Sequence, residues 1–178
     1  MNIRGCRFNI YLALVLVLAA VCGCKTSGNT NPKKLLSTFR LHLEAGRDGT
    51  KANEPVPIYR EKPVMINVQI DPFLVEKNVA EARVIDVVGG FALRIQYDHP
   101  GTGLLEGYTT ANIGRRIAVF SQFGHELKDG RWLAAPIITH RIRDGVFTFT
   151  PDATREECDE IALGLNNVSK KIHTWIDQ

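Results

Sequence analysis

Hydrophobic and polar residues alternate in two stretches of the first half of the chain. The first stretch covers residues 38–44 and the second covers residues 64–70. A period of two residues places alternate side chains on one face, so both stretches predict half-buried β-strands. Residues 45–57, between them, contain two glycines and two prolines. These residue types break a strand pattern, and the segment therefore predicts a loop.

A second pair of strand-like runs lies between residues 83 and 97. Residues 83–88 are rich in β-branched side chains, and residues 91–97 alternate strictly, with Gly89-Gly90 between them. Two glycines between such runs predict the turn of a β-hairpin. They do not indicate a phosphate loop, because no helix with Lys-Ser or Lys-Thr follows. Upstream, residues 74–82 predict a short helix from the spacing of Leu74, Val75, Val79 and Ala82.

Turn-forming residues divide the next part of the chain into short elements. His99-Pro-Gly-Thr-Gly is expected to interrupt regular secondary structure, and a short helix is expected after it, over residues 104–108. Strands are predicted at residues 116–123 and 146–149. Residues 132–142 form an apolar run that Pro136 interrupts. Because proline offers no N–H to a β-ladder, this run is expected at a sheet edge or a bend.

The C-terminal part carries the clearest helix signal. Thr154-Arg-Glu-Glu157 has the arrangement of a capping box, in which each of the two end residues bonds the backbone of the other. Apolar residues then recur on one helical face: Cys158, Ile161, Ala162, Leu165 and Val168. Asn166-Asn167 is expected to end or kink this helix. The elements together predict an α+β fold, with a mostly antiparallel sheet and two or three helices packed on it, after a cleaved signal helix.

The N-terminus has the layout of a secretory signal. Arg4 and Arg7 precede an uncharged run whose apolar centre spans residues 10–21. A helix of that length rises about 18 Å, which is short of the roughly 30 Å hydrocarbon core of a bilayer. The segment therefore predicts a leader that is removed from the mature protein. A retained signal anchor is the alternative.

The end of this leader, Val21-Cys22-Gly23-Cys24, resembles the lipobox of bacterial lipoproteins, in which a small residue precedes the lipidated cysteine. The resemblance implies cleavage after Gly23, a diacylglycerol on the Cys24 sulfur and an acyl chain such as palmitate on the new amine. Such chains would anchor the protein in a lipid bilayer. Lys25 replaces the aspartate linked to inner-membrane retention in enteric bacteria, which favours the outer membrane. Cleavage without lipid is the alternative.

These features predict three segments. Residues 1–23 are the signal peptide, residues 24–34 are the lipidated cysteine and a polar, flexible tether, and residues 35–178 are the folded domain. The predicted location is the cell envelope, on a membrane and facing the periplasm or the exterior.

Charge and cysteine usage narrow the possible partners. The formal net charge is +3, and it falls by two, to +1, when Arg4 and Arg7 leave with the signal peptide. A nearly neutral chain gives no support for nucleic-acid binding. Cys158 is the one cysteine outside the leader and the lipobox. Its place on the apolar helix face predicts a buried residue, with a reactive thiol as the less favoured reading.

No arrangement typical of catalysis is present in the sequence. The side chains that could act as general acids or bases are His42, His99, His125, His140, Asp98, Glu126 and Asp144. None has metal-ligand spacing, and His125-Glu126 lacks the second histidine of a zinc helix. We therefore predict no catalytic residue, no metal and no cofactor. A small-ligand binder or a hydrolase is the less favoured alternative.

Several motifs between residues 109 and 165 form an ordered set: Thr109-x-x-Asn112-x-Gly114-Arg115-x-x-Ala118, Ala135-Pro136-Ile137-Ile138, Ile142-x-Asp144-Gly145, Thr154-x-x-Glu157 and Leu165. This set resembles part of the first large periplasmic domain of SecD, a protein-export membrane subunit. The linker between Ala118 and Ala135 is longer than in that family, and its transmembrane helices are absent from this sequence. The resemblance thus implies a related α+β domain in the envelope, one that touches unfolded or secreted chains, and it does not imply a translocase.

The predicted function is that of a non-catalytic envelope lipoprotein that binds a protein of export or envelope assembly. An extended partner segment could join the edge near residues 132–138 by strand addition. Trp132, Pro136 and Ile138 are the predicted partner-binding residues. A structural spacer that only positions a lipid-anchored domain is the alternative.

Overall fold

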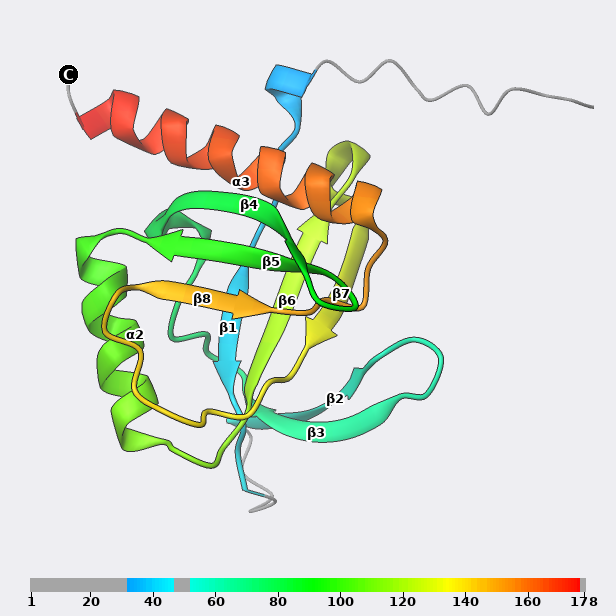
Figure 1. Cartoon of the computed structure of the whole chain (residues 1–178), viewed down its shortest axis with the longest axis vertical. Helices are drawn as coiled ribbons and strands as arrows, with labels where there is room; N and C mark the ends of the chain where they lie inside the picture. The colour runs from blue at the N-terminus through cyan, green and yellow to red at the C-terminus, as the bar shows by residue number, and fades with distance from the viewer. Residues whose placement is uncertain (1–31, 47–51, 177–178) are drawn as a thin grey trace, which may run out of the picture.

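The computed structural model describes residues 32–46 and 52–176. The predicted signal peptide, Cys24 and most of the predicted tether lie outside the described residues. Three antiparallel sheets and two α-helices make up the fold (Figure 1). The predicted α+β class is confirmed.

The first sheet has the order β1-β6-β7, with β1 at Arg40–Leu43, β6 at Ile117–Phe123 and β7 at Asp129–Ala134. The strands predicted at residues 38–44 and 116–123 are thus confirmed. Their alternate apolar side chains are fully buried, as Leu41 and Val119 illustrate. A short 3₁₀ turn, η3 at His125–Leu127, joins β6 to β7.

The second sheet has the order β4-β5-β8, with β4 at Val79–Val87, β5 at Gly90–Tyr97 and β8 at Val146–Phe149. The hairpin turn at Gly89-Gly90 is confirmed, and both glycines have positive φ. The helix predicted at residues 74–82 is wrong. Only the 3₁₀ turn η2 at Glu76–Asn78 forms there, because Val79 and Ala82 instead pair with β5 and bury their side chains in the sheet.

The third sheet is the separate hairpin β2 (Asn53–Ile58) and β3 (Val64–Gln69). The predicted β3 is confirmed, whereas the loop predicted over residues 45–57 is wrong at its C-terminal end. Pro55 and Pro57 are compatible with a strand because they face positions of the ladder that need no N–H from β2. The alternating Val56 and Ile58 are buried, and this burial holds the segment extended.

Helix α2 spans His99–Ala111 and begins earlier than predicted. The sequence His99-Pro-Gly-Thr-Gly was expected to be a breaker, yet it forms the first turn. The side chain of Asp98 caps this turn by accepting a hydrogen bond from the Gly101 N–H at 2.7 Å, and proline is favourable at the first positions of a helix.

Helix α3 spans Arg155–Ile176 and lies across β4 (Figure 1). The capping box is confirmed: Thr154 N–H donates to Glu157 Oε2 at 2.8 Å, and Glu157 N–H donates to Thr154 Oγ1 at 3.2 Å. The sequence predicted an end or a kink at Asn166-Asn167, and the helix does not end there. Both side chains bond carbonyl groups of neighbouring segments, so the helix continues through them.

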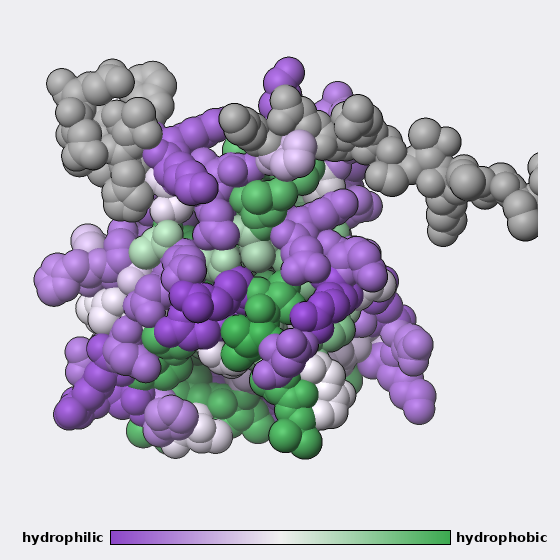
Figure 2. Space-filling view, turned by 45° about the horizontal axis from the view of Figure 1, so that its top comes forward, coloured by the Kyte–Doolittle hydropathy of each residue, from purple (hydrophilic) through white to green (hydrophobic). Residues whose placement is uncertain are grey.

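The main core lies between the β1-β6-β7 sheet, the β4-β5-β8 sheet and α3. Cys158 is fully buried there, as predicted, and burial raises the pKa of its thiol to about 12. A second core under the β2–β3 hairpin contains Val56, Ile58, Ile66, Val68, Ala118 and Ala135. On the face shown in Figure 2, hydrophilic side chains separate the exposed hydrophobic areas into patches.

Candidate functional site

The edges of the three sheets decide where a partner strand could bind, because an unpaired edge offers free N–H and C=O groups. At β4, the side chain of Asn166 from α3 takes the place of a neighbouring strand. It accepts from the Ala82 N–H and donates to the Ala82 C=O, both at 2.8 Å, and Ser169 Oγ donates to the Ala80 C=O at 3.0 Å. Helix α3 therefore covers this edge at Ala80 and Ala82.

Other edges are partly occupied by local contacts. At β1, the N–H of Leu41 donates to the Leu74 C=O and its C=O accepts from Phe73, both at 2.9 Å. At β7, the Leu133 C=O accepts from the Asp152 N–H at 2.7 Å. The outer edge of β2 lacks two donors because of Pro55 and Pro57.

The outer edge of β8 differs from these edges. The Tyr97 N–H donates to the Gly145 C=O at 2.9 Å, so the backbone of Gly145 faces β5. Backbone groups alternate in direction along a strand, and those of Val146 and Thr148 therefore face away from β5. The Val146 N–H is taken by Asp144 Oδ1 at 3.1 Å. Within the described residues, no hydrogen bond occupies the outward N–H and C=O of Thr148.

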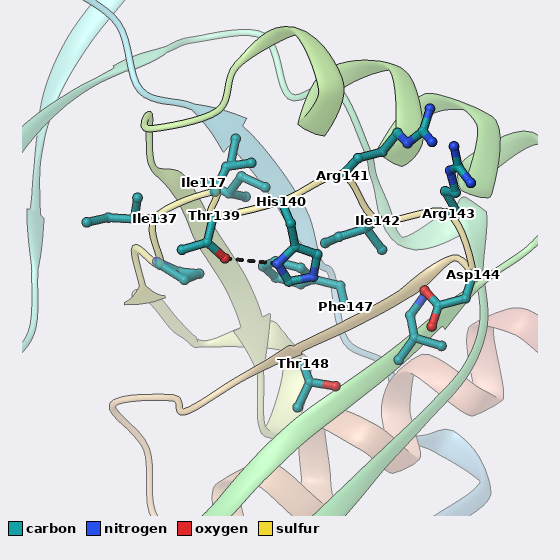
Figure 3. Close-up of a pocket in the computed structure, with 13 residues that line it drawn as sticks. Ile117, Ile137, Thr139, His140, Arg141, Ile142, Arg143, Asp144, Phe147 and Thr148 are labelled. Atoms are coloured by element: carbon teal, nitrogen blue, oxygen red, sulfur yellow. Dashed lines mark hydrogen bonds between the residues drawn. The ribbon is translucent and has the colours of Figure 1, made fainter.

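This free edge borders a groove of about 580 Å³. Residues 136–144 run back alongside β8 and form the opposite wall (Figure 3). The floor is apolar and includes Ile117, Ile138 and Phe147, all of which are at least 95% buried. The groove therefore has an apolar floor and one unpaired strand edge along its side.

The rim of the groove is polar. Arg141 and Arg143 point towards α2 in Figure 3. Glu106 Oε1 lies 3.6 Å from Arg141 Nη1 and 3.7 Å from Arg143 Nε. Figure 3 also shows the His140 ring beside Thr139, with Nδ1 2.9 Å from Thr139 Oγ1.

The turn that joins the two walls is held rigidly. Gly145 has φ +68°, and a side chain there would collide with Thr102. The Gln96 amide donates to the Asp144 C=O at 3.1 Å. These contacts fix the spacing of the wall and β8 without bonding them across the groove.

Two of the three predicted partner-binding residues line this groove. Pro136 and Ile138 are there, but their backbones already pair with the start of β6: Ile117 N–H donates to the Pro136 C=O, and Ile138 N–H donates to the Arg115 C=O. Ile138 is 5% exposed, whereas its neighbour Ile137 is 48% exposed. The wall therefore presents the side chain of Ile137, which sequence reasoning did not single out.

Trp132 lies elsewhere. Its ring packs edge-on against the His42 ring, with 5.0 Å between the ring centroids, and its centroid lies 5.2 Å from that of Phe120. Trp132 also covers the second core. It also lines a separate hollow of about 430 Å³ beside the β2–β3 hairpin, together with Tyr59 and Arg60. The structure thus does not bring Trp132 together with Pro136 and Ile138 in one cavity.

His42 connects the hairpin to the body of the protein. Its Nδ1 is 2.8 Å from the Gln69 C=O, and because a carbonyl can only accept, Nδ1 carries the proton. The side chain is buried, and burial lowers its pKa below the ordinary value for histidine. His42 is therefore neutral at pH 7 and serves as a structural link.

The histidines considered as acid–base candidates are not gathered at the groove. Among the described residues that line it, His140 is the single histidine. Besides Ile137, sequence reasoning missed Thr148. Its strand was predicted, but which of its backbone groups face outward depends on the pairing with β5.

Comparison with known proteins assigns the family. Residues 53–169, well over half of the chain, match the model of the SecDF P1 head subdomain. The chain belongs to the SecDF P1 head family. This subdomain is a periplasmic part of SecD and SecDF, and the predicted resemblance is confirmed.

Individual relatives agree with this family. The chain is 28% identical over 143 residues to the protein translocase subunit SecDF of Thermus thermophilus, covering 74% of this chain and 18% of the relative. A solved structure of SecDF, described as a membrane component that enhances protein export, aligns with a TM-score of 0.53 at 21% identity, over 75% of this chain and 63% of the other. A crystal structure of SecDF in a super-membrane-facing form aligns with a TM-score of 0.53 at 21% identity. The alignment covers 74% of this chain and 19% of the other. The chain thus spans about a fifth of its full-length relative.

The quoted family motifs have structural roles in the P1 head. Asn112 ends α2: its Nδ2 donates to the Tyr108 C=O at 2.9 Å, and its Oδ1 accepts from Arg115 at 2.7 Å. Arg115 also donates to the Glu44 C=O beyond β1. Gly114 has φ +88°, which suits glycine. These contacts set the position of residues 136–138 and hence of the groove wall.

No helix among residues 32–46 and 52–176 is long and apolar enough to cross a membrane.

Proposed function

We propose that this protein is a lipid-anchored P1 head that binds an extended segment of a partner protein in export or envelope assembly. The segment adds to the outer edge of β8 and fills the groove. Main-chain hydrogen bonds supply affinity in such complexes, and alternate side chains supply selectivity. The observation that supports the proposal most is the outward backbone of Thr148, unbonded within the described part of the chain, beside a groove with an apolar floor.

The predicted partner-binding residues have separate roles in this proposal. Pro136 and Ile138 shape the wall and floor of the groove. Trp132 holds the β2–β3 hairpin against β7, so its loss would act on the groove through the position of the sheet. The proposed role is non-catalytic, because strand addition needs no nucleophile and no metal.

A proline substitution tests the strand addition. Thr148→Pro removes the outward N–H but no hydrogen bond to β5, and edge strands tolerate proline. Thr148→Val is the matched control, because it keeps the N–H and the β-branched shape. We expect quantitative mass spectrometry of proteins that co-purify from membranes to show specific partners with the native and Thr148→Val proteins and their loss with Thr148→Pro.

Ile137→Asp provides a second variant at an exposed position of the wall. It should also release the partner, because a carboxylate would be desolvated when the groove is filled. Thermal melts verify that each variant is folded. Identical partner sets for the native, Thr148→Pro and Ile137→Asp proteins would refute strand addition and would favour the structural spacer.

The lipid anchor is tested separately. Mass spectrometry of the mature N-terminus should find a diacylglyceryl group on Cys24, and Cys24→Ser should release the protein from membranes. An unmodified thiol at Cys24 in the native protein would contradict the anchor and leave the groove proposal standing.

A further inference from the structure

The register of β8 fixes how an added strand would lie. A partner residue opposite Thr148 can bond both its outward N–H and its outward C=O, as in a hydrogen-bonded antiparallel pair. The side chain of that residue then lies on the same face as Thr148, which is exposed. Its two neighbours in the partner chain point to the opposite face, where Phe147 and Ile117 form the apolar floor. The site thus distinguishes the central residue from its neighbours.

An unpaired cation lies on the exposed face beside Thr148. Arg94 of β5 is directly opposite Thr148 on one side and opposite Arg83 of β4 on the other. Arg83 is engaged by Glu81 at 2.6 Å. Within the described residues, no ion pair or side-chain hydrogen bond engages Arg94. Like charges directly opposite on neighbouring strands are unfavourable, so an added anion near Arg94 would be stabilising.

The distances allow an anion on the added strand to reach Arg94. Neighbouring strands lie about 4.8 Å apart, so the added strand is roughly 9.6 Å from β5. The long arginine side chain can extend over the small Thr148 and meet a glutamate from the other side. The small side chain of Thr148 therefore leaves room for the two charged side chains to meet.

Other charges at the groove favour the same register. Arg141 and Arg143 are directed towards Glu106, away from β8 (Figure 3). Asp144 is fixed at the Val146 end of the strand, where its Oδ1 accepts from the Val146 N–H. Its carboxylate would repel an acidic partner residue placed at that end, but not one opposite Thr148, farther along the strand.

We propose that the groove selects an extended segment in which an acidic residue lies between two apolar residues, with the acidic side chain over Thr148 next to Arg94. This inference rests on the proposed strand addition and specifies its partner. The apolar neighbours bury their side chains on the floor of the groove, and the central carboxylate neutralises Arg94.

Peptide binding to the full chain in detergent tests this inference. The probes are fluorescein-labelled peptides with a central Val-Glu-Val, Val-Gln-Val or Val-Lys-Val sequence, flanked by Ser and Thr, measured by fluorescence anisotropy. At low salt the Glu peptide should bind about twofold to fivefold more tightly than the Gln peptide, which is the range for a partly exposed ion pair. The Lys peptide should bind most weakly, and the differences should shrink at high salt.

The variant Arg94→Gln should remove the preference for Glu over Gln, so that the ratio of the two affinities falls to about one. Lys128→Gln, which removes a cation just after η3, is the control and should keep the preference. Equal binding of the Glu and Gln peptides to the native protein would overturn the acidic preference while strand addition stands. Absence of binding by all three peptides would overturn this inference, and the Thr148→Pro co-purification would then show whether the proposed function also fails.

Discussion

The substitution Asn166→Ala tests whether the Asn166 side chain stabilises the protein by taking the place of a strand beside β4. The Asn166 side chain makes two hydrogen bonds of 2.8 Å to the N–H and C=O of Ala82, which is 2% exposed. Alanine removes both bonds and leaves two poorly hydrated backbone groups on β4. Because each lost bond costs about 0.5–1.5 kcal/mol, and more where water cannot replace the partner, we expect a total loss of about 2–4 kcal/mol.

Urea unfolding of the full chain in detergent, followed by far-UV circular dichroism, measures this free energy. For a domain of this size, the expected loss corresponds to a fall in Tm of roughly 6–12 °C. Asn167→Ala is the matched control on the same helix. It removes two bonds of 2.9 Å to the Pro32 and Leu35 carbonyls, one of which is solvent-exposed, and should cost only about 1–2 kcal/mol.

The two variants should also differ in association. An exposed β4 edge can pair with a second copy, so Asn166→Ala should form larger species in light scattering, whereas Asn167→Ala should not. A loss below about 1 kcal/mol for Asn166→Ala, with unchanged association, would refute the reasoning that this side chain substitutes for a strand.

Two further predictions concern stability. Burial lowers the pKa of His42, so at a pH below the ordinary histidine pKa the unfolded chain binds a proton that the folded chain does not. The free energy of unfolding should therefore fall as the pH drops from 7.5 to 5.5. This fall should be smaller for the His42→Gln variant. An equal decline in both proteins would exclude His42 as the cause. A Cβ at Gly164 would lie 2.7 Å from the Ser37 backbone nitrogen, so Gly164→Ala should destabilise the protein by about 1–3 kcal/mol, whereas Gly107→Ala on α2, with nothing within 4 Å, should stabilise it by about 0.5–1 kcal/mol. Calorimetric melts of both glycine variants decide this, and an unchanged Tm for Gly164→Ala would contradict the close packing of α3 on residues 36–37.

The accuracy of the sequence predictions follows from the range of the interactions involved. The capping box at Thr154, the Gly89-Gly90 turn and the alternating strands are set by residues close in sequence, and all are confirmed. The helix predicted at residues 74–82 failed because its apolar spacing suits a helix as well as a strand, and pairing with β5 decides between them.

The candidate site depended more strongly on distant contacts. Pro136 was expected at a sheet edge or a bend, and it lies after the end of β7, where its C=O accepts from the Ile117 N–H. The burial of Ile138 and the packing of Trp132 on His42 come from segments far away in the chain. The free edge at Thr148 could not be read from a strand of alternating residues, because the same alternation is compatible with either backbone direction. Only the bond between Tyr97 and Gly145 assigns that direction.

In-cell photocrosslinking from the groove wall tests the central claim most directly. A photoreactive residue replaces the exposed Ile137, and the comparison position is Val88, in the fully exposed turn between β4 and β5. Strand addition predicts discrete adducts from position 137 that disappear when Thr148→Pro is added and persist with Thr148→Val. Adducts that survive Thr148→Pro, or the same adducts from position 88, would contradict it.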